Sequence, residues 1–347
     1  MNVRLKNVGE QVMVITGASS GIGLATARMA ARQGTRLVLA ARSADDLAQL
    51  VAELSAQGCH AVSVEADVAE EADVRRIADV ARERFGGFDT WVNNAGVSVY
   101  GKCVDVPVAD MRRLFETNVW GVIHGSRVAC EHLVRHGGAL INIGSEVSDK
   151  AVPLQGAYSA SKHAVKGWTD ALRMELEQDG APVSVTLVKP GPIDTPYTQH
   201  ARNYLEDEPT HAPPVYSPDS VAEAILYAAQ TPVRDLFVGG GARMVAAMAG
   251  WAPRLTDRVV GRMVSSGTHS GRPRTSGDAL YTRGGGLRER GDYEGLVRRS
   301  LYTTAATHPM AAGAVALGAT LLLGTLLSGG GDAVRGRTSR HDRPSPQ

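Results

Sequence analysis

The chain has 347 residues, of which 43% are hydrophobic and 21% are charged, and its net charge is +1. This length fits one α/β catalytic domain of about 250 residues with an additional segment, and the small net charge argues against nucleic acid as a partner. Three cysteines without zinc or disulfide spacing predict a reduced, cytoplasmic protein, and the mixed, polar residues 1–11 predict no export signal.

Apolar, strand-like runs alternate with helical patterns between residues 11 and 240. This alternation predicts a Rossmann-type α/β fold, in which helices cover both faces of a doubly wound, parallel, seven-stranded sheet. The seven runs are Val12 to Thr16, Leu37 to Ala41, Ala61 to Glu65, Thr90 to Asn93, Ala139 to Ile143, Val183 to Val188 and Leu236 to Val238.

The first run is followed by a glycine-rich turn and then by a helical pattern. The turn reads Thr16-Gly17-Ala18-Ser19-Ser20-Gly21-Ile22-Gly23. Its glycines allow a tight turn and a close approach of backbone N–H groups to a phosphate, while the helix N-terminus adds a positive dipole end. We therefore predict a dinucleotide-binding turn. A turn that serves only packing is the alternative, and the strand-turn-helix context argues against it.

The second run ends at Ala41 and is followed by Arg42 rather than by an acid. An acid at this place binds the ribose 2′-hydroxyl of NAD, whereas an arginine can pair with the 2′-phosphate of NADP. The sequence therefore favours NADP(H) over NAD(H). A solvated Arg42 is the alternative interpretation, and the nearby Asp45 and Asp46 keep NAD(H) open.

Tyr158 and Lys162 are four residues apart in a helical pattern, so we expect them on one face of a helix. A neighbouring ammonium and an oxidised nicotinamide ring favour the phenolate of a tyrosine, which can then exchange a proton with an alcohol or a carbonyl. Ser145 directly follows the fifth run and is expected at the carboxyl edge of the sheet. The alternative for Ser145 is a capping role. Asn118, farther upstream, is a further candidate site residue, and the alternative for it is a hydrogen bond to the backbone inside a helix.

In combination, the glycine-rich turn, the stretch Asn93-Asn94-Ala95-Gly96 and the Tyr158–Lys162 pair resemble the short-chain dehydrogenase/reductase family over about residues 8–245. The resemblance implies that Ser145 polarises the substrate oxygen and that Tyr158 is the general acid/base. It further implies that Lys162 also orients the nicotinamide ribose, that Asn118 holds a water, and that the protein is a homodimer or homotetramer. The implied cofactor-binding residues are Gly17, Ser19, Ser20, Gly21, Ile22, Gly23, Arg42, Asp67, Val68, Asn94, Ala95, Gly96, Tyr158, Lys162, Ile193 and Thr195.

The predicted function is that of an NADP(H)-dependent oxidoreductase that transfers a hydride between nicotinamide and the carbon of an alcohol or carbonyl substrate. An NAD-linked dehydrogenase of the same fold and a non-catalytic nucleotide-sensing protein are the alternatives. The stretch Tyr197 to Ser217 follows Pro190-Gly191-Pro192 and is expected to be either a mobile lid over an apolar or bulky substrate or a plain surface loop.

Composition divides the chain into a catalytic domain (1–250), a Gly/Arg-rich extension or linker (251–308), an apolar segment (309–328) and a disordered basic tail (329–347). Within the second part, Ser265 to Gly291 lacks a sustained apolar period and is expected to be a linker or a poorly ordered extension. Met310 to Leu327 is uncharged and nearly meets the length of about 20 residues that a membrane span needs. We expect it to anchor a cytoplasmic catalytic domain to a membrane, and a helix packed on that domain or on a second subunit is the alternative.

Overall fold

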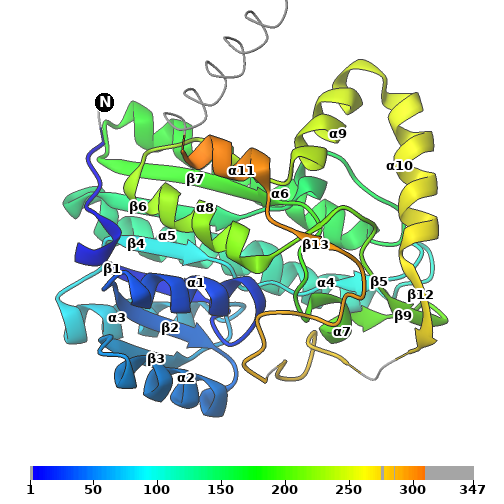
Figure 1. Ribbon diagram of the computed structural model, residues 1–347. Coiled ribbons are helices and arrows are strands. Elements are labelled where there is room, and N and C mark those ends of the chain that lie inside the picture. Colours follow the sequence, from blue (N-terminus) through cyan, green and yellow to red (C-terminus); the bar gives the residue numbers. More distant parts are fainter. Residues whose placement is uncertain (1–2, 275–276, 285, 309–347) are drawn as a thin grey trace, which may run out of the picture. The chain divides into compact units, whose positions relative to one another are not determined.

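The computed structural model describes residues 3–274, 277–284 and 286–308, and its centre is a seven-stranded parallel sheet (Figure 1). The strand order is β11-β7-β6-β4-β1-β2-β3, and every neighbouring pair is parallel. All seven predicted strands and the predicted fold class are confirmed. The strands are β1 Val12–Thr16, β2 Arg36–Ala41, β3 Ala61–Glu65, β4 Thr90–Asn93, β6 Gly138–Ile143, β7 Val183–Pro190 and β11 Asp235–Val238.

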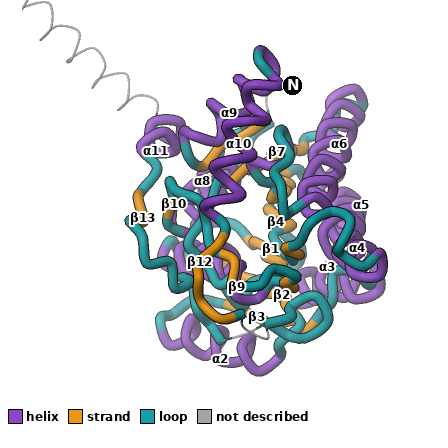
Figure 2. Tube along the Cα trace, turned by 90° about the vertical axis from the view of Figure 1, so that its right-hand side faces the viewer, coloured by secondary structure: helices purple, strands orange, loops and turns teal. Residues whose placement is uncertain are grey.

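Helices pack on both faces of the sheet, which leaves the strands between two apolar cores (Figure 2). In β1, Met13 and Ile15 belong to one core, whereas Val12 and Val14 belong to the other, because successive side chains of a strand point to opposite faces. The first core is completed by α1 Gly21–Arg32, α2 Ala44–Ala56 and α8 Pro218–Gln230. The second is completed by α3 Glu71–Phe85, α5 Gly121–His136 and α6 Gly156–Gln178.

The chain changes direction within the sheet between β1 and β4. From β1 it continues outward through β2 and β3, and it then returns to place β4 on the other side of β1. Loops at the carboxyl ends of such neighbouring strands leave a crevice, which is where open α/β sheets bind ligands. The glycine-rich turn after β1 and the stretch after β4 therefore meet at one edge of the sheet.

Short elements surround this edge. Helix α4 Val108–Phe115 continues through a π-helical turn, Glu116–Trp120, into α5, and a short 3₁₀ turn forms at Glu146–Ser148. Another 3₁₀ turn, Val8–Glu10, precedes β1 at the opposite edge of the sheet. The predicted lid contains α7 Tyr197–His200 and small strands that pair with other parts of the chain. The pairs are β5 Val99–Tyr100 with β8 Arg202–Asn203, β9 Asp207–Pro209 with β12 His269–Pro273, and β10 Val215–Tyr216 with β13 Val297–Arg298. The stretch is thus held by backbone pairing at three places, which differs from the mobile lid or plain loop expected from its composition.

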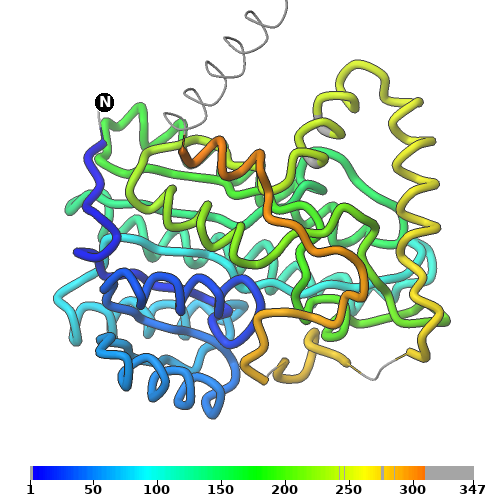
Figure 3. The backbone as a smooth tube through the Cα atoms, in the orientation of Figure 1, coloured from blue at the N-terminus to red at the C-terminus, as the bar shows by residue number. Residues whose placement is uncertain are grey.

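The chain beyond residue 250 also differs from its predicted character. The described residues up to Thr303 form one compact unit, which includes α9 Gly240–Trp251 and α10 Pro253–Gly267. Helix α11 spans Leu301–Thr307. We use the name strap for the described residues among 277–291, which Figure 3 shows in orange beside the blue N-terminal elements.

The strap is packed against the core, whereas its composition predicted a linker or a poorly ordered extension. Leu280 is fully buried in a cluster with Val97, Val99, Val106 and Leu114. Arg42 and Arg113 donate hydrogen bonds to the strap carbonyls of Ala279 and Leu280. One buried leucine and backbone hydrogen bonds are enough to fix a segment that has no apolar periodicity.

The expected membrane segment, Met310 to Leu327, lies outside the described residues. Among residues 3–308, with the gaps given above, no helix combines the length and the apolar character that a membrane crossing requires.

The packing of the strap predicts a stability effect of Leu280→Ala. The substitution removes buried methyl groups and leaves a cavity, so it should lower the free energy of unfolding by about 2–4 kcal/mol in chemical denaturation. Leu296→Ala is the matched control, because Leu296 is 69% exposed and its loss should have little effect. Equal stability of the Leu280 variant and the wild type would mean that the strap does not pack on the core.

Candidate active site

The glycine-rich turn adopts a conformation that only glycine supports at two positions. Gly17 and Gly21 have φ angles of +68° and +53°. A Cβ atom on Gly17 would lie 2.8 Å from Cα of Ala95, and one on Gly23 would lie 2.1 Å from the carbonyl oxygen of Gly17. The turn is therefore closely packed against the loop after β4 and against the first turn of α1.

Hydrogen bonds join this turn to the stretch after β4. The Thr16 hydroxyl accepts from the backbone N–H groups of Asn94 (3.0 Å) and Ala95 (3.1 Å). The Asn94 side-chain amide donates to the carbonyl oxygens of Thr16 (2.9 Å) and Gly17 (3.2 Å). Asn94 thus fixes the two loops relative to each other, and it leaves the N-terminal end of α1 facing the space beside them.

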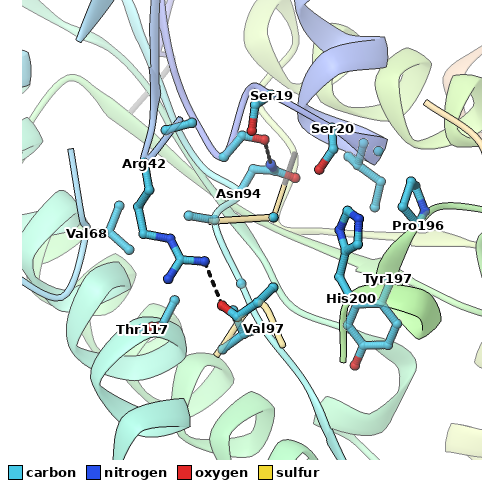
Figure 4. A pocket seen from close by; sticks show the side chains of 18 of the residues that line it. Ser19, Ser20, Arg42, Val68, Asn94, Val97, Thr117, Pro196, Tyr197 and His200 are labelled. Atoms are coloured by element: carbon cyan, nitrogen blue, oxygen red, sulfur yellow. Dashed lines mark hydrogen bonds between the residues drawn. The ribbon is translucent and has the colours of Figure 1, made fainter. Parts of the chain in front are cut away.

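That space is a cavity that gathers twelve of the sixteen predicted cofactor-binding residues (Figure 4). Ser19 and Ser20 lie on one side of it, and Arg42 extends into it from the end of β2 (Figure 4). Gly23 does not line this cavity, and it serves the packing of the turn. The twelve are Gly17, Ser19, Ser20, Gly21, Ile22, Arg42, Asp67, Val68, Asn94, Ala95, Gly96 and Thr195.

Arg42 differs from the arginines around it in having no acidic partner among the described residues. Its guanidinium donates to the carbonyl oxygen of Ala279 at 2.6 Å, and burial lowers the pKa of Arg42. Arg42 also lines a separate surface cavity together with three other arginines. These three form the ion pairs Arg76–Asp73, Arg113–Asp67 and Arg283–Glu65. The end of β2 therefore presents one partly buried guanidinium that forms no ion pair with a carboxylate of the described residues.

A second cavity adjoins the first and holds Ser145, Tyr158 and Lys162. Ile193 lines it too, and Ile22, Asn94, Gly96 and Thr195 line both cavities. Of the four remaining predicted cofactor-binding residues, Tyr158, Lys162 and Ile193 line this second cavity. Gly23 lines neither of the two cavities. The structure brings the predicted proton-transferring residues to the boundary with the predicted nucleotide site.

Tyr158 and Lys162 lie on one face of α6, as their spacing predicts. The Nζ atom of Lys162 is 5.7 Å from the centre of the Tyr158 ring and donates to the carbonyl oxygen of Ile143 at 2.8 Å. Burial lowers the pKa of Lys162 to about 8. Burial also raises the pKa of Tyr158, and hydrogen bonds with Tyr197 and Ser145 oppose that rise. Without a bound cofactor, the pKa of Tyr158 is therefore raised rather than lowered, although a lowered value was expected beside Lys162. The reason is that desolvation of the phenolate is the largest effect on this pKa.

Asn118 is fully buried in the π-helical turn and lines neither cavity. Its side-chain oxygen accepts from Val97 N–H (2.8 Å), and its amide donates to the Val97 carbonyl (2.9 Å) and to the Ser161 hydroxyl (3.1 Å). A Cβ atom on Gly96 would lie 3.4 Å from Asn118 Oδ1 and 3.9 Å from Lys162 Nζ. Asn118 therefore connects the loop after β4 to α6 directly behind Lys162.

Ser145 begins the short helical turn at the end of β6. Its hydroxyl accepts from Val147 N–H (3.3 Å), and the Ser148 hydroxyl accepts from Ser145 N–H (3.1 Å). The residue thus has the capping contact that was the alternative to a catalytic role, and it lines the second cavity as well. Capping fixes the backbone here, so the hydroxyl is held at the cavity wall.

Several residues of the second cavity were not predicted from the sequence. Tyr197 packs edge-on against Tyr158, with ring centres 5.6 Å apart, and His211 stacks on Tyr197 at 6.3 Å. Val264 of α10 and Thr268, which directly follows that helix, also line the cavity. Glu146 lines the cavity as well, and it could have been found from the sequence because it directly follows Ser145. Nothing in the composition after residue 250 indicated that this part of the chain contributes to the cavity.

Glu146 and His211, which both line the second cavity, are held towards their neutral forms. Desolvation raises the pKa of Glu146 to about 7 and lowers the pKa of His211 to about 4. The Nε2 atom of His211 is buried and has no hydrogen-bond partner among the described residues. The second cavity therefore carries a carboxyl and a ring nitrogen that have no hydrogen-bond partner among the described residues.

Comparison with known proteins agrees with this geometry. The family model described as short chain dehydrogenase matches residues 11–206. The uncharacterized oxidoreductase YxnA of Bacillus subtilis is 48% identical over 322 residues, covering 91% of this chain and 90% of the relative. This similarity is longer than the family match, so it takes in part of the chain beyond residue 250.

Two solved structures are similar in fold. A short chain dehydrogenase/reductase of Burkholderia phymatum in complex with NAD has a TM-score of 0.65 and 27% identity, covering 80% of this chain and 99% of that one. An alcohol dehydrogenase of the archaeon Thermococcus sibiricus, complexed with 5-hydroxy-NADP, has a TM-score of 0.59 and 29% identity, covering 66% and 95%.

The raised pKa of Glu146 predicts a pH-dependent stability difference between the wild type and Glu146→Gln. Between the unfolded pKa of about 4.5 and the folded pKa of about 7 the folded wild type binds more protons, so its stability falls as the pH rises. The variant lacks this titration, and it should gain on the order of 2–3 kcal/mol over the wild type across that interval in chemical denaturation.

The control for this measurement is Glu175→Gln, which changes an exposed carboxyl on α6. Its stability difference from the wild type should stay constant over the same pH interval. A constant difference for Glu146→Gln as well would show that its carboxyl titrates like a solvated one.

Proposed function

Since the chain belongs to the short-chain dehydrogenase family, we propose that it is an NADP(H)-dependent oxidoreductase that interconverts an alcohol and a ketone or aldehyde. The observation that carries the proposal is that Ser145, Tyr158 and Lys162 line one cavity and that this cavity shares five lining residues, the four given above and Tyr197, with the predicted nucleotide site. A reacting carbon in the second cavity would thus be next to a ring held at the shared boundary.

The residues that would hold the cofactor fit a dinucleotide. The backbone of Ala95 comes so close to the glycine-rich turn that the turn has no room for a side chain there. Helix α1 begins at the cavity, and a helix N-terminus is a favourable place for a phosphate. Lys162 is within reach of the boundary between the cavities, in line with a role at the nicotinamide ribose. Bound NADPH would supply the hydride that the substrate carbon accepts.

In the direction of reduction, the chain's own residues would supply the proton. The Ser145 hydroxyl donates a hydrogen bond to the carbonyl oxygen and polarises it, and the Tyr158 phenol transfers its proton to the same oxygen as the alcohol forms. The phenolate that remains is stabilised by the Lys162 ammonium and regains a proton from solvent. In oxidation, the same groups act in reverse.

The unpaired charge of Arg42 supports NADP(H) as the preferred cofactor. A 2′-phosphate carries nearly two negative charges and would supply the partner that Arg42 lacks, whereas the 2′-hydroxyl of NAD would leave the guanidinium without an anion. The two similar solved structures hold NAD in one case and an NADP derivative in the other. The local residues at the end of β2 are therefore the basis for the preference.

The role of Tyr158 is tested by Tyr158→Phe in an NADPH-oxidation screen across ketones and aldehydes. The variant should bind NADPH as the wild type does, in a fluorescence titration, and its kcat should fall by about 10²–10⁴-fold because the proton donor is lost. Tyr227→Phe on α8 is the control and should keep full activity. Undiminished kcat in the Tyr158 variant would remove Tyr158 from this role, and a wild type that binds NADPH but reduces no carbonyl would favour a nucleotide-sensing protein.

The role of Arg42 is tested by Arg42→Ala with both cofactors. Loss of one charge-assisted contact should lower kcat/KM for NADPH by about 10–100-fold and leave kcat/KM for NADH nearly unchanged. Arg36→Ala, at the opposite end of β2, is the control. An equal effect on the two cofactors, or no effect on either, would contradict the assignment of Arg42 to the 2′-phosphate.

A further inference from the structure

Glu146 occupies a fixed position on the wall of the second cavity. It lies between Ser145 and Val147 in the short turn Glu146–Ser148, and the hydrogen bonds of Ser145 and Ser148 hold that turn at the end of β6. The carboxyl is close enough to Tyr158 for its charge to raise the pKa of the phenol. Its place in the cavity is therefore beside the two groups that would contact the substrate oxygen.

The carboxyl has no hydrogen bond or ion pair with any other described residue, although basic residues lie near it in the chain. Lys150 pairs with Asp257, Lys189 pairs with Asp149 at 2.9 Å, and Lys162 donates to the Ile143 carbonyl. These cations are therefore engaged elsewhere. A carboxyl that is partly withdrawn from water without a partner costs free energy, which a ligand with a hydrogen-bond donor would recover.

The groups that face Glu146 across the cavity do not supply that donor. Helix α6 contributes Tyr158 and Lys162, and α7 contributes Tyr197. The loop before β10 contributes His211, and Thr268 directly follows α10. His211 is neutral at physiological pH because burial lowers its pKa to about 4, so it adds no positive charge. Much of the remaining wall is apolar, including Val147, Val152 and Val264.

We propose that Glu146 is a substrate-recognition residue, which accepts a hydrogen bond from a hydroxyl or amino group that the substrate carries next to its reacting carbon. The substrate class is then a hydroxy- or amino-substituted ketone, or the corresponding diol or amino alcohol in the reverse direction. This inference rests on the proposed function, because it takes the reacting carbonyl to lie at Ser145 and Tyr158. The apolar residues around the pair accommodate the rest of the substrate.

The experiment compares matched substrates in NADPH-dependent reduction. Cyclohexanone is paired with 2-hydroxycyclohexanone, and 2-butanone with 3-hydroxy-2-butanone and 3-amino-2-butanone. The wild type should show a kcat/KM at least about tenfold higher for the substituted member of each pair, since a site with an unpaired polar group discriminates against an analogue that lacks the donor. Glu146→Ala should abolish that preference, so that the substituted and the plain ketones are reduced with similar kcat/KM.

Glu146→Gln distinguishes the two kinds of donor, because its amide oxygen still accepts a hydrogen bond but carries no charge. Reduction of hydroxyketones should be retained, and reduction of the aminoketone should fall by at least about tenfold. Glu175→Gln, an exposed carboxyl on the same helix as Tyr158, should leave all ratios as in the wild type. Thermal unfolding of each variant establishes that it is folded.

The outcomes separate the two levels of the argument. A wild type that reduces plain and substituted ketones equally well, or a Glu146→Ala variant whose effect is the same on both, overturns the role of Glu146 and leaves the proposed oxidoreductase activity in place. A wild type that reduces neither kind overturns both. If Glu146→Ala does not fold, loss of the aminoketone preference in Glu146→Gln carries the proposal, and an unchanged preference overturns it.

Discussion

The hydrogen bonds between Thr16 and the loop after β4 connect the two halves of the candidate site. Thr16 accepts from Asn94 and Ala95, and the Asn94 side chain returns hydrogen bonds to the glycine-rich turn. The same loop leads to Gly96, which lies against Asn118 and Lys162. The nucleotide turn and the lysine beside Tyr158 are therefore linked through one stretch of backbone, and a change in that stretch would be felt in both cavities.

Charge pairing marks the parts of the molecule that are available to ligands. Most acidic and basic groups around the site have partners in the described structure, such as Arg113 with Asp67 and Lys189 with Asp149. Arg42 and Glu146 have none, and they lie in different cavities. A positive group in one cavity and an acidic group in the other are thus the places where the proposed NADP(H) and the proposed donor-bearing substrate would find a charged partner.

Much of this architecture could be predicted from the sequence, because it follows from side-chain patterns. Apolar runs predicted all seven strands, and the glycines of the turn predicted the strand-turn-helix junction at Gly17. The placement of Tyr158 and Lys162 on one face of α6 followed from their spacing. The direction of the Tyr158 pKa did not follow, because it depends on how much of the ring the fold buries.

The strap could not be predicted, since its contacts are made largely by groups that every residue possesses. The carbonyl of Ala279 accepts from Arg42, and the carbonyl of Arg288 accepts from the backbone N–H of Gly21 at 2.9 Å. Backbone carbonyls leave no signature in composition or periodicity. The single apolar anchor, Leu280, is isolated among glycines, arginines and threonines and does not form a pattern by itself.

The strap also changes where this protein can be shortened. A chain ended at residue 250, where composition places the end of the catalytic domain, would lose the carbonyl partners of Arg42 and of the Gly21 amide, together with Val264 and Thr268 on the other cavity. The range matched by the family model ends still earlier, at residue 206. A fragment that keeps these contacts therefore has to extend at least to Arg288, even though the shared motifs lie in the first two thirds of the chain.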